Sequence, residues 1–339
     1  MIQQAISQIV QGQALAEEEA QQVMSVIMEG QATPAQIGAF LAALRLKGET
    51  VAEITGFARA MRAKAVPMPV NHRLVVDTCG TGGDSKGTFN ISTAAAIVTA
   101  ACGVPVAKHG NRSVSSSCGS ADVLEALGVN VLLTAEQATA CLEEVGLTFL
   151  FAPSFHLAMK YAAAPRRELG IRTVFNLLGP LTNPAGARAQ VLGVYDGRLT
   201  EVLALVLGRL GSEHVFVVHG EDGLDEATVT GPTTVSELHG GGVRTFALHP
   251  EDVGLARWPE EALQGGPAED NARIILALLQ GEKGARRDIV LLNAALALVA
   301  AGQAPGIEEG VVMAAAAVDS GAAMQVLERL VTFSRSCAA

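Results

Sequence analysis

A glycine-rich stretch of polar residues is the part of the sequence best suited to bind a ligand. The stretch DTCGTGGDSKGTFNIST, residues 77–93, has four glycines within residues 80–87. Glycine lets the backbone adopt positive φ angles and approach a ligand closely. The apolar run before the stretch is typical of a strand, and the alanine-rich segment after it is typical of a helix, whose N-terminus favours an anion such as phosphate. A tight structural turn is the alternative.

The spacing of these glycines fits neither of the two common nucleotide-binding fingerprints. The GxxxxGK[ST] pattern of Walker loops is absent, and so is the GxGxxG pattern of dinucleotide-binding folds. The stretch therefore indicates an anion site of another kind.

A second polar segment follows the apolar run PVAK, which is predicted to be the next strand. The segment KHGNRSVSSSCGSAD, residues 108–122, contains Lys108, His109, Asn111 and Arg112 together with several serines. Loops that leave parallel strands at their carboxyl ends meet at one edge of the sheet, where ligands bind. Two partly cationic loops at one edge can hold a ligand with more than one phosphate, although a solvated turn would have a similar composition.

A third segment, HGEDGLDEATV, places four carboxylates after the predicted strand VFVVH. They are Glu221, Asp222, Asp225 and Glu226. Carboxylates opposite a polyphosphate require a cation between them, and Mg²⁺ is the usual one. An acidic surface loop is the alternative to a metal site.

Composition limits the classes of ligand and the cellular setting. The formal net charge is −10, aromatic residues make up 4%, and residues 77–120 carry a local +1. This balance disfavours nucleic acid and favours a small anionic ligand. The five cysteines form no CxxC pair, which disfavours a disulfide framework or thiolate metal site. No apolar run reaches membrane-spanning length and the opening residues lack signal-peptide features, so we expect a cytoplasmic protein without a membrane partner.

The pattern of elements predicts a helical lobe followed by an α/β lobe. Thr33 and Thr50 each begin a capping box before helically spaced apolar residues, and Gly48 is placed to end the first of these helices. Two prolines within residues 66–72 mark a boundary. Short apolar strands then alternate with helices, which indicates an α/β architecture. The last 70 or so residues return to a helical pattern.

The motifs, in their order, resemble those of the anthranilate phosphoribosyltransferases. The resemblance is carried by DTCGTGGD, the NIST of residues 90–93, KHGNRSVSSSCGSADVLEALG and GLDE, and by the stretch FAPSFHLAMKYAAAPRRELGIRTVFNLLGPLTNP. It extends over essentially the whole chain. It implies a nucleoside phosphorylase/phosphoribosyltransferase-type fold. The helical domain would span residues 1–70, completed by helices around 155–180. The α/β domain, residues 71–339, would have a central, mostly parallel sheet flanked by helices.

The resemblance also implies the reaction. The phosphoribosyl group of phosphoribosyl pyrophosphate (PRPP) passes to the amine of anthranilate, giving N-(5-phosphoribosyl)anthranilate and pyrophosphate in the second step of tryptophan biosynthesis from chorismate. The displacement at ribose C1 is expected to be oxocarbenium-like and Mg²⁺-dependent, with two ions per site. A homodimer formed through the helical domain is expected. The substrates would be the small-molecule partners.

Roles for individual residues follow from the same resemblance. The residues implied in PRPP binding are Gly80, Gly83, Asp84, Thr88, Asn90, Ile91, Ser92, Thr93, Lys108, Ser116 and Ser120. The metal contacts would be Ser92, Asp225 and Glu226, and the catalytic residues Lys108, Asp225 and Glu226. Those implied in anthranilate binding are Gly80, His109, Asn111 and Arg166. The sequence alone does not choose between Arg166 and its neighbour Arg167, and His156 is a further candidate at this pocket.

Two other functions remain open at this point. A pyrimidine nucleoside phosphorylase would share the helical lobe and the glycine-rich loop, but the KHGNR run and the Asp225–Glu226 pair favour the transferase. A non-catalytic relative that binds nucleic acid would need a basic surface, which the net charge of −10 disfavours.

Overall fold

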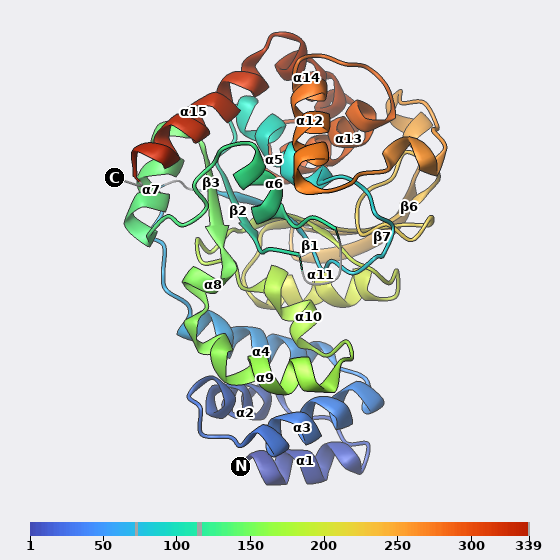
Figure 1. Cartoon of the computed structure of the whole chain (residues 1–339). Helices are drawn as coiled ribbons and strands as arrows, with labels where there is room; N and C mark the ends of the chain where they lie inside the picture. Colours follow the sequence, from blue (N-terminus) through green and yellow to red (C-terminus); the bar gives the residue numbers. More distant parts are fainter. Residues whose placement is uncertain (72–73, 114–116, 338–339) are drawn as a thin grey trace.

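The computed structural model describes residues 1–71, 74–113 and 117–337 and has a helical bundle on one side of a larger α/β lobe (Figure 1). The bundle begins with four helices: α1 (Ile2–Val10), α2 (Glu17–Met28), α3 (Pro34–Lys47) and α4 (Val51–Lys64). Two later helices, α9 (Lys160–Leu169) and α10 (Phe175–Leu178), pack against them. Both of these helices lie within residues 155–180.

The capping boxes predicted from the sequence are both formed. Thr33 accepts a hydrogen bond from the backbone N–H of Gln36, and Thr50 accepts one from that of Glu53. Gly48 ends α3 with a φ of 86°, a conformation that glycine adopts without a steric penalty. These local signals fix where the helices begin and end.

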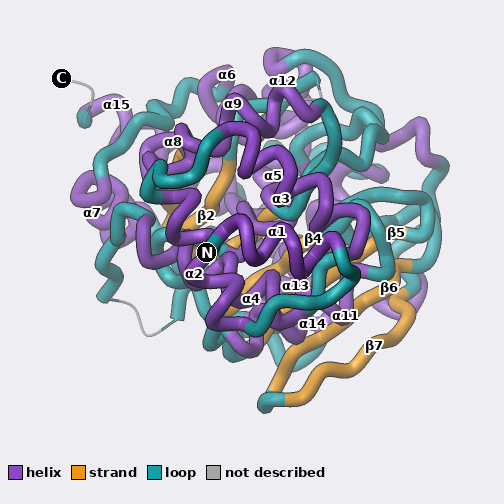
Figure 2. Tube along the Cα trace, turned by 90° about the horizontal axis from the view of Figure 1, so that it is seen from below, coloured by secondary structure: helices purple, strands orange, loops and turns teal. Residues whose placement is uncertain are grey.

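The α/β lobe is built on a seven-stranded sheet of order β3-β2-β1-β4-β5-β6-β7. The strands are β1 (Val76–Gly80), β2 (Val106–Gly110), β3 (Leu147–Phe151), β4 (Ala189–Gly193), β5 (His214–Gly220), β6 (Thr233–His239) and β7 (Gly242–Leu248). The first five strands in this order run parallel, whereas β6 and β7 are antiparallel to their neighbours. The hairpin formed by β6 and β7 extends the sheet at one side of the molecule (Figure 2).

Helices cover both faces of the sheet, which confirms the predicted fold class. The upper helices in Figure 1 are α5 (Ile91–Ala101), α6 (Ser120–Ala126), α12 (Ala268–Leu279), α13 (Ala285–Ala300), α14 (Ile307–Asp319) and α15 (Ala322–Ser336). The remaining helices of this lobe are α7 (Ala135–Val145), α8 (Ala152–Phe155) and α11 (Leu199–Arg209). The last of these packs against both α4 and β5, so it joins the bundle to the lower face of the sheet.

Alternation along β5 shows how the two faces are filled. Phe216 and Val218 belong to the core under the upper helices, whereas Val215 and Val217 belong to the core shared with the bundle. Successive side chains of a strand point to opposite faces, so the continuous apolar run VFVV is what a strand buried on both sides requires.

Among the described residues, no single helix is long and apolar enough to cross a membrane. Together, α14 and α15 have the length and apolar composition of a membrane span, but they are bent by 65° at the break between them.

A buried carboxylate holds the first turns of the bundle together. Glu53 is fully buried and accepts hydrogen bonds from the backbone N–H of Leu15 at 3.0 Å and of Thr50 at 2.9 Å. Lys47 Nζ lies 2.9 Å from its Oε2. One side chain thus satisfies donors from the α1–α2 loop, from α3 and from the start of α4.

We expect Glu53→Ala to destabilise the protein by roughly 3–5 kcal/mol, because it removes the carboxylate that pairs with the largely buried Lys47 and that accepts from the Leu15 and Thr50 N–H groups. The measurement is urea-induced unfolding of wild type and variant. Glu18→Ala, which removes an exposed carboxylate of α2, is the matched control and should change the free energy of unfolding by less than about 0.5 kcal/mol. Equal effects of the two substitutions would contradict the structural role given to Glu53.

Candidate active site

The glycine-rich loop and the acidic loop meet at the carboxyl edge of the sheet. The backbone N–H of Gly82, after β1, donates to Asp225 Oδ2 at 2.7 Å. The backbone N–H of Ser92, in the first turn of α5, donates to Glu226 Oε1 at 3.1 Å. These two hydrogen bonds hold the acidic loop against the glycine-rich loop, and Glu226 places a carboxylate at a helix N-terminus, where negative charge is stabilised.

Two glycines at strand ends make this contact possible. A Cβ atom added to Gly193, the last residue of β4, would collide with the backbone carbonyl of Asp225. One added to Gly80, the last residue of β1, would lie 2.7 Å from Asp225 Oδ2. The acidic loop can lie directly on the ends of these two strands only because neither position carries a side chain.

Lys108, the last residue of the predicted strand PVAK, lies within a strand, and so does the His109 that follows it. The strand β2 includes both Lys108 and His109, and the Lys108 side chain is only 3% exposed. Its Nζ donates to the Thr78 carbonyl and, at 3.2 Å, to Ser92 Oγ. Burial lowers the pKa of Lys108, and nearby carboxylates, first Asp77, oppose this shift. The structure thus places a buried cation beneath the first turn of α5.

Asp77, to which the sequence analysis gave no role, is the anionic counterpart of Lys108. It is fully buried and accepts hydrogen bonds from the His109 backbone N–H at 3.0 Å and from Asn183 Nδ2 at 2.8 Å. Burial raises its pKa, while Lys108 acts in the opposite direction. The only sequence signal was a charged residue inside an apolar strand, and its partner Asn183 lies 106 positions away.

The two carboxylates of the acidic loop are electrostatically unfavourable as they stand. Burial, followed by the charges of Asp84 and Glu226, raises the pKa of Asp225 well above its usual range. Burial also raises the pKa of Glu226, to about 7, although Lys108 opposes the shift. Hard cations prefer carboxylate and hydroxyl oxygens. Asp225, Glu226 and the neighbouring Ser92 hydroxyl therefore fit Mg²⁺ chemically.

The other two carboxylates of this loop are engaged elsewhere. Asp222 accepts hydrogen bonds from the hydroxyls of Thr228 and Thr230, each at 2.6 Å, and from the Leu224 backbone N–H. Glu221 accepts one from Thr234 at 2.7 Å. Both carboxylates thus shape the loop, and only the second pair of the four faces the glycine-rich segment.

The serine-rich segment is tied to the first loop through Asn90. Asn90 Nδ2 donates to the Cys118 carbonyl at 3.2 Å, and Asn271 Nδ2 donates to Asn90 Oδ1 at 3.0 Å. Arg112 pairs with Asp122 and with Glu125 of α6, so its charge is neutralised by neighbouring carboxylates. Ser116 lies outside the described residues.

The remaining residues predicted to bind PRPP lie in the glycine-rich loop or in the helices that follow the two polar loops. Gly83 and Asp84 lie within it, and Thr88 forms an isolated bridge to Gln264. Ile91 and Thr93 lie in the first turn of α5, the latter with a buried hydroxyl that has no partner among the described residues. Ser120 begins α6, and its hydroxyl donates to the Asn111 carbonyl at 3.2 Å.

Two buried histidines lie side by side near this edge. The centroids of the His109 and His156 rings are 5.0 Å apart, and neither Nε2 atom has a hydrogen-bond partner within the described part of the chain. Burial lowers the pKa of His109 to about 3 and that of His156 to about 4. Both imidazoles are therefore neutral at physiological pH and have unused hydrogen-bonding capacity.

Arg166 is a half-buried cation without an anionic partner. Its guanidinium lies over the Phe175 ring, 5.0 Å from the centroid, and burial lowers its pKa. Within residues 1–71, 74–113 and 117–337, its side chain makes no hydrogen bond or ion pair. Arg167 is exposed. The structure distinguishes the two arginines where the sequence did not, but it shows no contact between Arg166 and the glycine-rich loop.

Arg172 is a contact that the sequence analysis missed. Its Nη2 donates to the Gly83 carbonyl, and its guanidinium lies 4.3 Å from the centroid of the Tyr195 ring. Gly83 itself has a φ of 80°. No local motif marks this arginine, because its partner lies 89 positions earlier in the chain.

Comparison with known proteins first places the chain among the glycosyl transferases. Residues 3–65 match the helical bundle domain of a glycosyl transferase family, and residues 72–324 match the a/b domain of the same family. The chain is 60% identical over 339 residues to anthranilate phosphoribosyltransferase of Moorella thermoacetica, covering 100% of both chains. It is 60% identical to that of Pelotomaculum thermopropionicum, covering 98% of this chain and 97% of the relative.

Solved structures agree with this result. The crystal structure of anthranilate phosphoribosyltransferase from Thermus thermophilus is 50% identical, with a TM-score of 0.92 over 98% of this chain and 99% of that one. The enzyme from Saccharomyces cerevisiae in complex with PRPP and Mg is 28% identical, with a TM-score of 0.90 over 99% and 98% of the two chains. The chain belongs to the anthranilate phosphoribosyltransferase family, which confirms the resemblance seen in the motifs.

The raised pKa of Glu226 predicts how stability depends on pH without metal. A carboxyl with a raised pKa in the folded state stabilises the fold below its ordinary pKa, 4.5 here, and this contribution is lost as pH rises through about 7. Wild type in EDTA should therefore lose roughly 1–3 kcal/mol more stability than Glu226→Gln between pH 5 and pH 8.

Urea unfolding at several pH values checks this expectation. Glu221→Gln, which alters an exposed carboxylate of the same loop, is the matched control and should follow the wild-type pH profile. Parallel profiles for wild type and Glu226→Gln would show that the carboxyl ionises normally in the folded protein.

Proposed function

We propose that this chain transfers the 5-phosphoribosyl group of PRPP to the amine of anthranilate and releases pyrophosphate, in the second step of tryptophan biosynthesis from chorismate. The observation that carries the proposal is the packing of Asp225 and Glu226 against the glycine-rich loop and the first turn of α5. A cation bound between these carboxylates and a polyphosphate at the anion-binding edge would relieve the repulsion that raises their pKa values.

Mg²⁺ is the cation that this donor set favours. Asp225, Glu226 and the Ser92 hydroxyl would hold it, and we propose two ions per site, as the pyrophosphate has several oxygens to neutralise. When bound, Mg²⁺ supplies positive charge to the departing pyrophosphate. The yeast relative was solved with PRPP and Mg, which supports this choice.

The chain's own groups stabilise the leaving group in two ways. The buried Lys108 cation lies beneath Ser92, within the first turn of α5, and adds positive charge where the pyrophosphate oxygens gain negative charge. Backbone N–H groups of the glycine-rich loop and of residues 90–93 that are not already bonded within the protein would donate to the same oxygens. Because these donors are held by β1, β2 and α5, little reorganisation is needed as the bond to ribose C1 breaks.

The acceptor side requires recognition of a carboxylate but no strong base. Arg166, partly desolvated and unpaired among the described residues, suits the carboxylate of anthranilate. Gly80, Asn111 and His109 are the other proposed contacts. The aromatic amine is neutral with its lone pair available, and His109 stays neutral because its pKa is about 3. His109 is therefore suited to hydrogen bonding and not to holding charge.

Assembly and location complete the proposal. We infer that the chain divides into a helical domain, residues 1–70 with the 155–180 region, and an α/β domain, residues 71–339. We further infer a cytoplasmic homodimer formed through the helical domain. Exposed apolar side chains on the bundle support this interface: Leu46 is 89% exposed, Val10 70% and Leu157 60%. Each of these side chains would gain free energy if a second copy covered it.

One assay tests the reaction directly. Purified protein is mixed with PRPP, Mg²⁺ and anthranilate, and the loss of anthranilate fluorescence is followed. The loss should require all three components. Phosphorolysis of thymidine in place of this reaction would support the nucleoside phosphorylase alternative.

Removing one carboxylate should weaken the response to Mg²⁺. Asp225→Asn keeps an acceptor for the Gly82 N–H but loses a charge facing the cation, so the Mg²⁺ concentration for half-maximal activity should rise about tenfold or more. Glu221→Gln, in the same loop, should match wild type. An unchanged Mg²⁺ dependence of Asp225→Asn would remove Asp225 from the metal site.

Removing the unpaired guanidinium should weaken acceptor binding selectively. A charge-assisted hydrogen bond contributes roughly 1.5–3 kcal/mol, so Arg166→Ala should raise KM for anthranilate about ten- to a hundredfold while KM for PRPP changes little. The exposed neighbour supplies the control, since Arg167→Ala should leave both constants near wild type. A rise confined to the PRPP constant would place Arg166 elsewhere in the site.

A further inference from the structure

Two histidines and a glutamate gather at the end of the sheet opposite the active site. His214 is the first residue of β5, whose last residue, Gly220, leads into the acidic loop. Glu237 and His239 lie near the end of β6. Because β5 and β6 are antiparallel, all three residues lie at the amino edge of the parallel strands, whereas the glycine-rich loop leaves the carboxyl edge. The active site described above uses none of them.

The strand register places these three side chains on one face. His214 is paired directly with His239, and Glu237 precedes His239 by two residues. Directly paired residues of antiparallel strands have neighbouring Cβ atoms, and residues two apart on one strand share a face. Phe216, which pairs with Glu237, packs in the core under the upper helices, so the cluster faces the same side.

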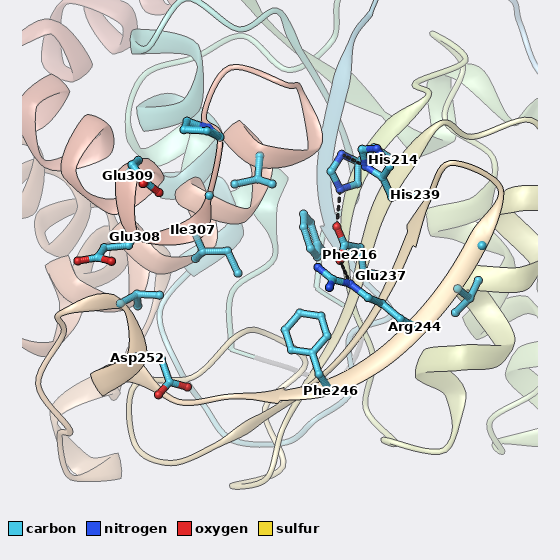
Figure 3. Close-up of a pocket in the computed structure, with 16 residues that line it drawn as sticks. His214, Phe216, Glu237, His239, Arg244, Phe246, Asp252, Ile307, Glu308 and Glu309 are labelled. Carbon is cyan, nitrogen blue, oxygen red and sulfur yellow. Dashed lines mark hydrogen bonds and ion pairs between the residues drawn. The ribbon is translucent and has the colours of Figure 1, made fainter.

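The side chains form a continuous hydrogen-bonded chain (Figure 3). His239 Nδ1 lies 3.1 Å from His214 Nδ1, and His214 Nε2 lies 2.9 Å from Glu237 Oε1. The other oxygen of Glu237 accepts from Arg244 Nε at 2.6 Å. His214 and Glu237 are largely buried, and His239 is exposed at the rim. The cluster is therefore partly preorganised and open to solvent at one end.

We propose that His214, Glu237 and His239 bind a borderline transition-metal ion, for which Zn²⁺ is the best match. One donor atom from each residue lies within 4.8 Å of the other two. Tetrahedral Zn²⁺ with bonds of about 2.0–2.1 Å separates its ligand atoms by about 3.4 Å, so small side-chain rotations suffice. Two imidazoles and one carboxylate are a donor set that proteins use for zinc with an open fourth position.

The surroundings of the cluster favour a cation. A cavity of about 800 Å³ adjoins it, and Figure 3 shows Asp252, Glu308 and Glu309 on the far side from the histidines. These three carboxylates outnumber the single arginine of the lining, Arg244. Arg244 is already paired with Glu237, and such an outer hydrogen bond orients a ligating carboxylate. The open coordination position would face this cavity and take water or a small ligand.

The proposed ion is chemically distinct from the Mg²⁺ of the active site. Imidazole nitrogen selects borderline metals such as Zn²⁺, whereas carboxylate and hydroxyl oxygens suit Mg²⁺. An excess of Mg²⁺ should occupy the carboxyl edge without filling the histidine cluster. Binding of Zn²⁺ in that background reports on the second site alone.

The test is Zn²⁺ binding by the full chain in excess Mg²⁺, measured by calorimetric titration, with Co²⁺ absorption as a spectroscopic check. Wild type should bind one equivalent and melt at a higher temperature when Zn²⁺ is added. His239→Gln removes an exposed ligand without disturbing the core and should bind at least about tenfold more weakly, with no such rise in Tm. Glu237→Gln should also weaken binding.

A matched histidine variant separates this site from unspecific binding. His249→Gln removes a histidine that lies outside the cluster and should bind like wild type. His239→Gln should leave the kinetics of the transferase reaction unchanged, because it lies at the opposite edge of the sheet. Absence of Zn²⁺ binding by wild type, or equal affinity of wild type and His239→Gln, would overturn the proposal.

Discussion

The active site depends on one close approach, that of the Asp225 backbone to the ends of β1 and β4. Side chains at Gly80 or Gly193 would fill the space that this backbone and its carboxylate occupy. The approach brings Asp225 onto the Gly82 N–H and Glu226 onto the start of α5. The two carboxylates are thereby held against the backbone N–H groups of the glycine-rich loop and of α5. It also concentrates like charges, since Asp84 and Glu226 both raise the pKa of Asp225 in addition to the larger effect of burial. The fold therefore holds carboxylates in an arrangement that bound cation and anion together make favourable.

The bundle contributes to this arrangement through contacts far from its own core. Arg62 of α4 donates to the Leu181 carbonyl at 2.7 Å and to the Leu210 carbonyl at 3.1 Å, so it ties the bundle to segments on both sides of α11. Arg172, between α9 and α10, holds the Gly83 carbonyl. The glycine-rich loop is thus anchored from both lobes, and a shift of the α9–α10 segment would act on it directly.

Local signals in the sequence predicted what is local in the structure. The capping boxes at Thr33 and Thr50 and the strand–loop–helix order around Gly80 needed only neighbouring residues, and all of them are present. The strand bounds were less accurate: the predicted strand PVAK ended at Lys108, whereas β2 continues through His109 to Gly110. The buried Asp77 allows the charged Lys108 to lie within β2. Contacts that depend on register or on distant pairing were not visible, since the partners of Asp77 and Gly83 lie 106 and 89 positions away. The roles implied for PRPP and anthranilate contacts came from family resemblance, and they remain predictions.

The histidine cluster depends on the register of β5 with β6, which could not be predicted from the sequence. This register also places the cluster where a bound ion would join the two strands. His214 and His239 join β5 to β6 beside the turn at Gly240 and Gly241, which connects β6 to β7. The outer strand β7 is largely exposed and, within the described sheet, has only β6 as a neighbouring strand, so the pairing of β6 with β5 joins the hairpin to the rest of the sheet. An ion bound across that pair would crosslink the two strands at their solvent-exposed end. Because β5 is buried on both faces and runs from the cluster to the acidic loop, the same strand would then link a borderline metal at one edge of the sheet to a hard metal at the other.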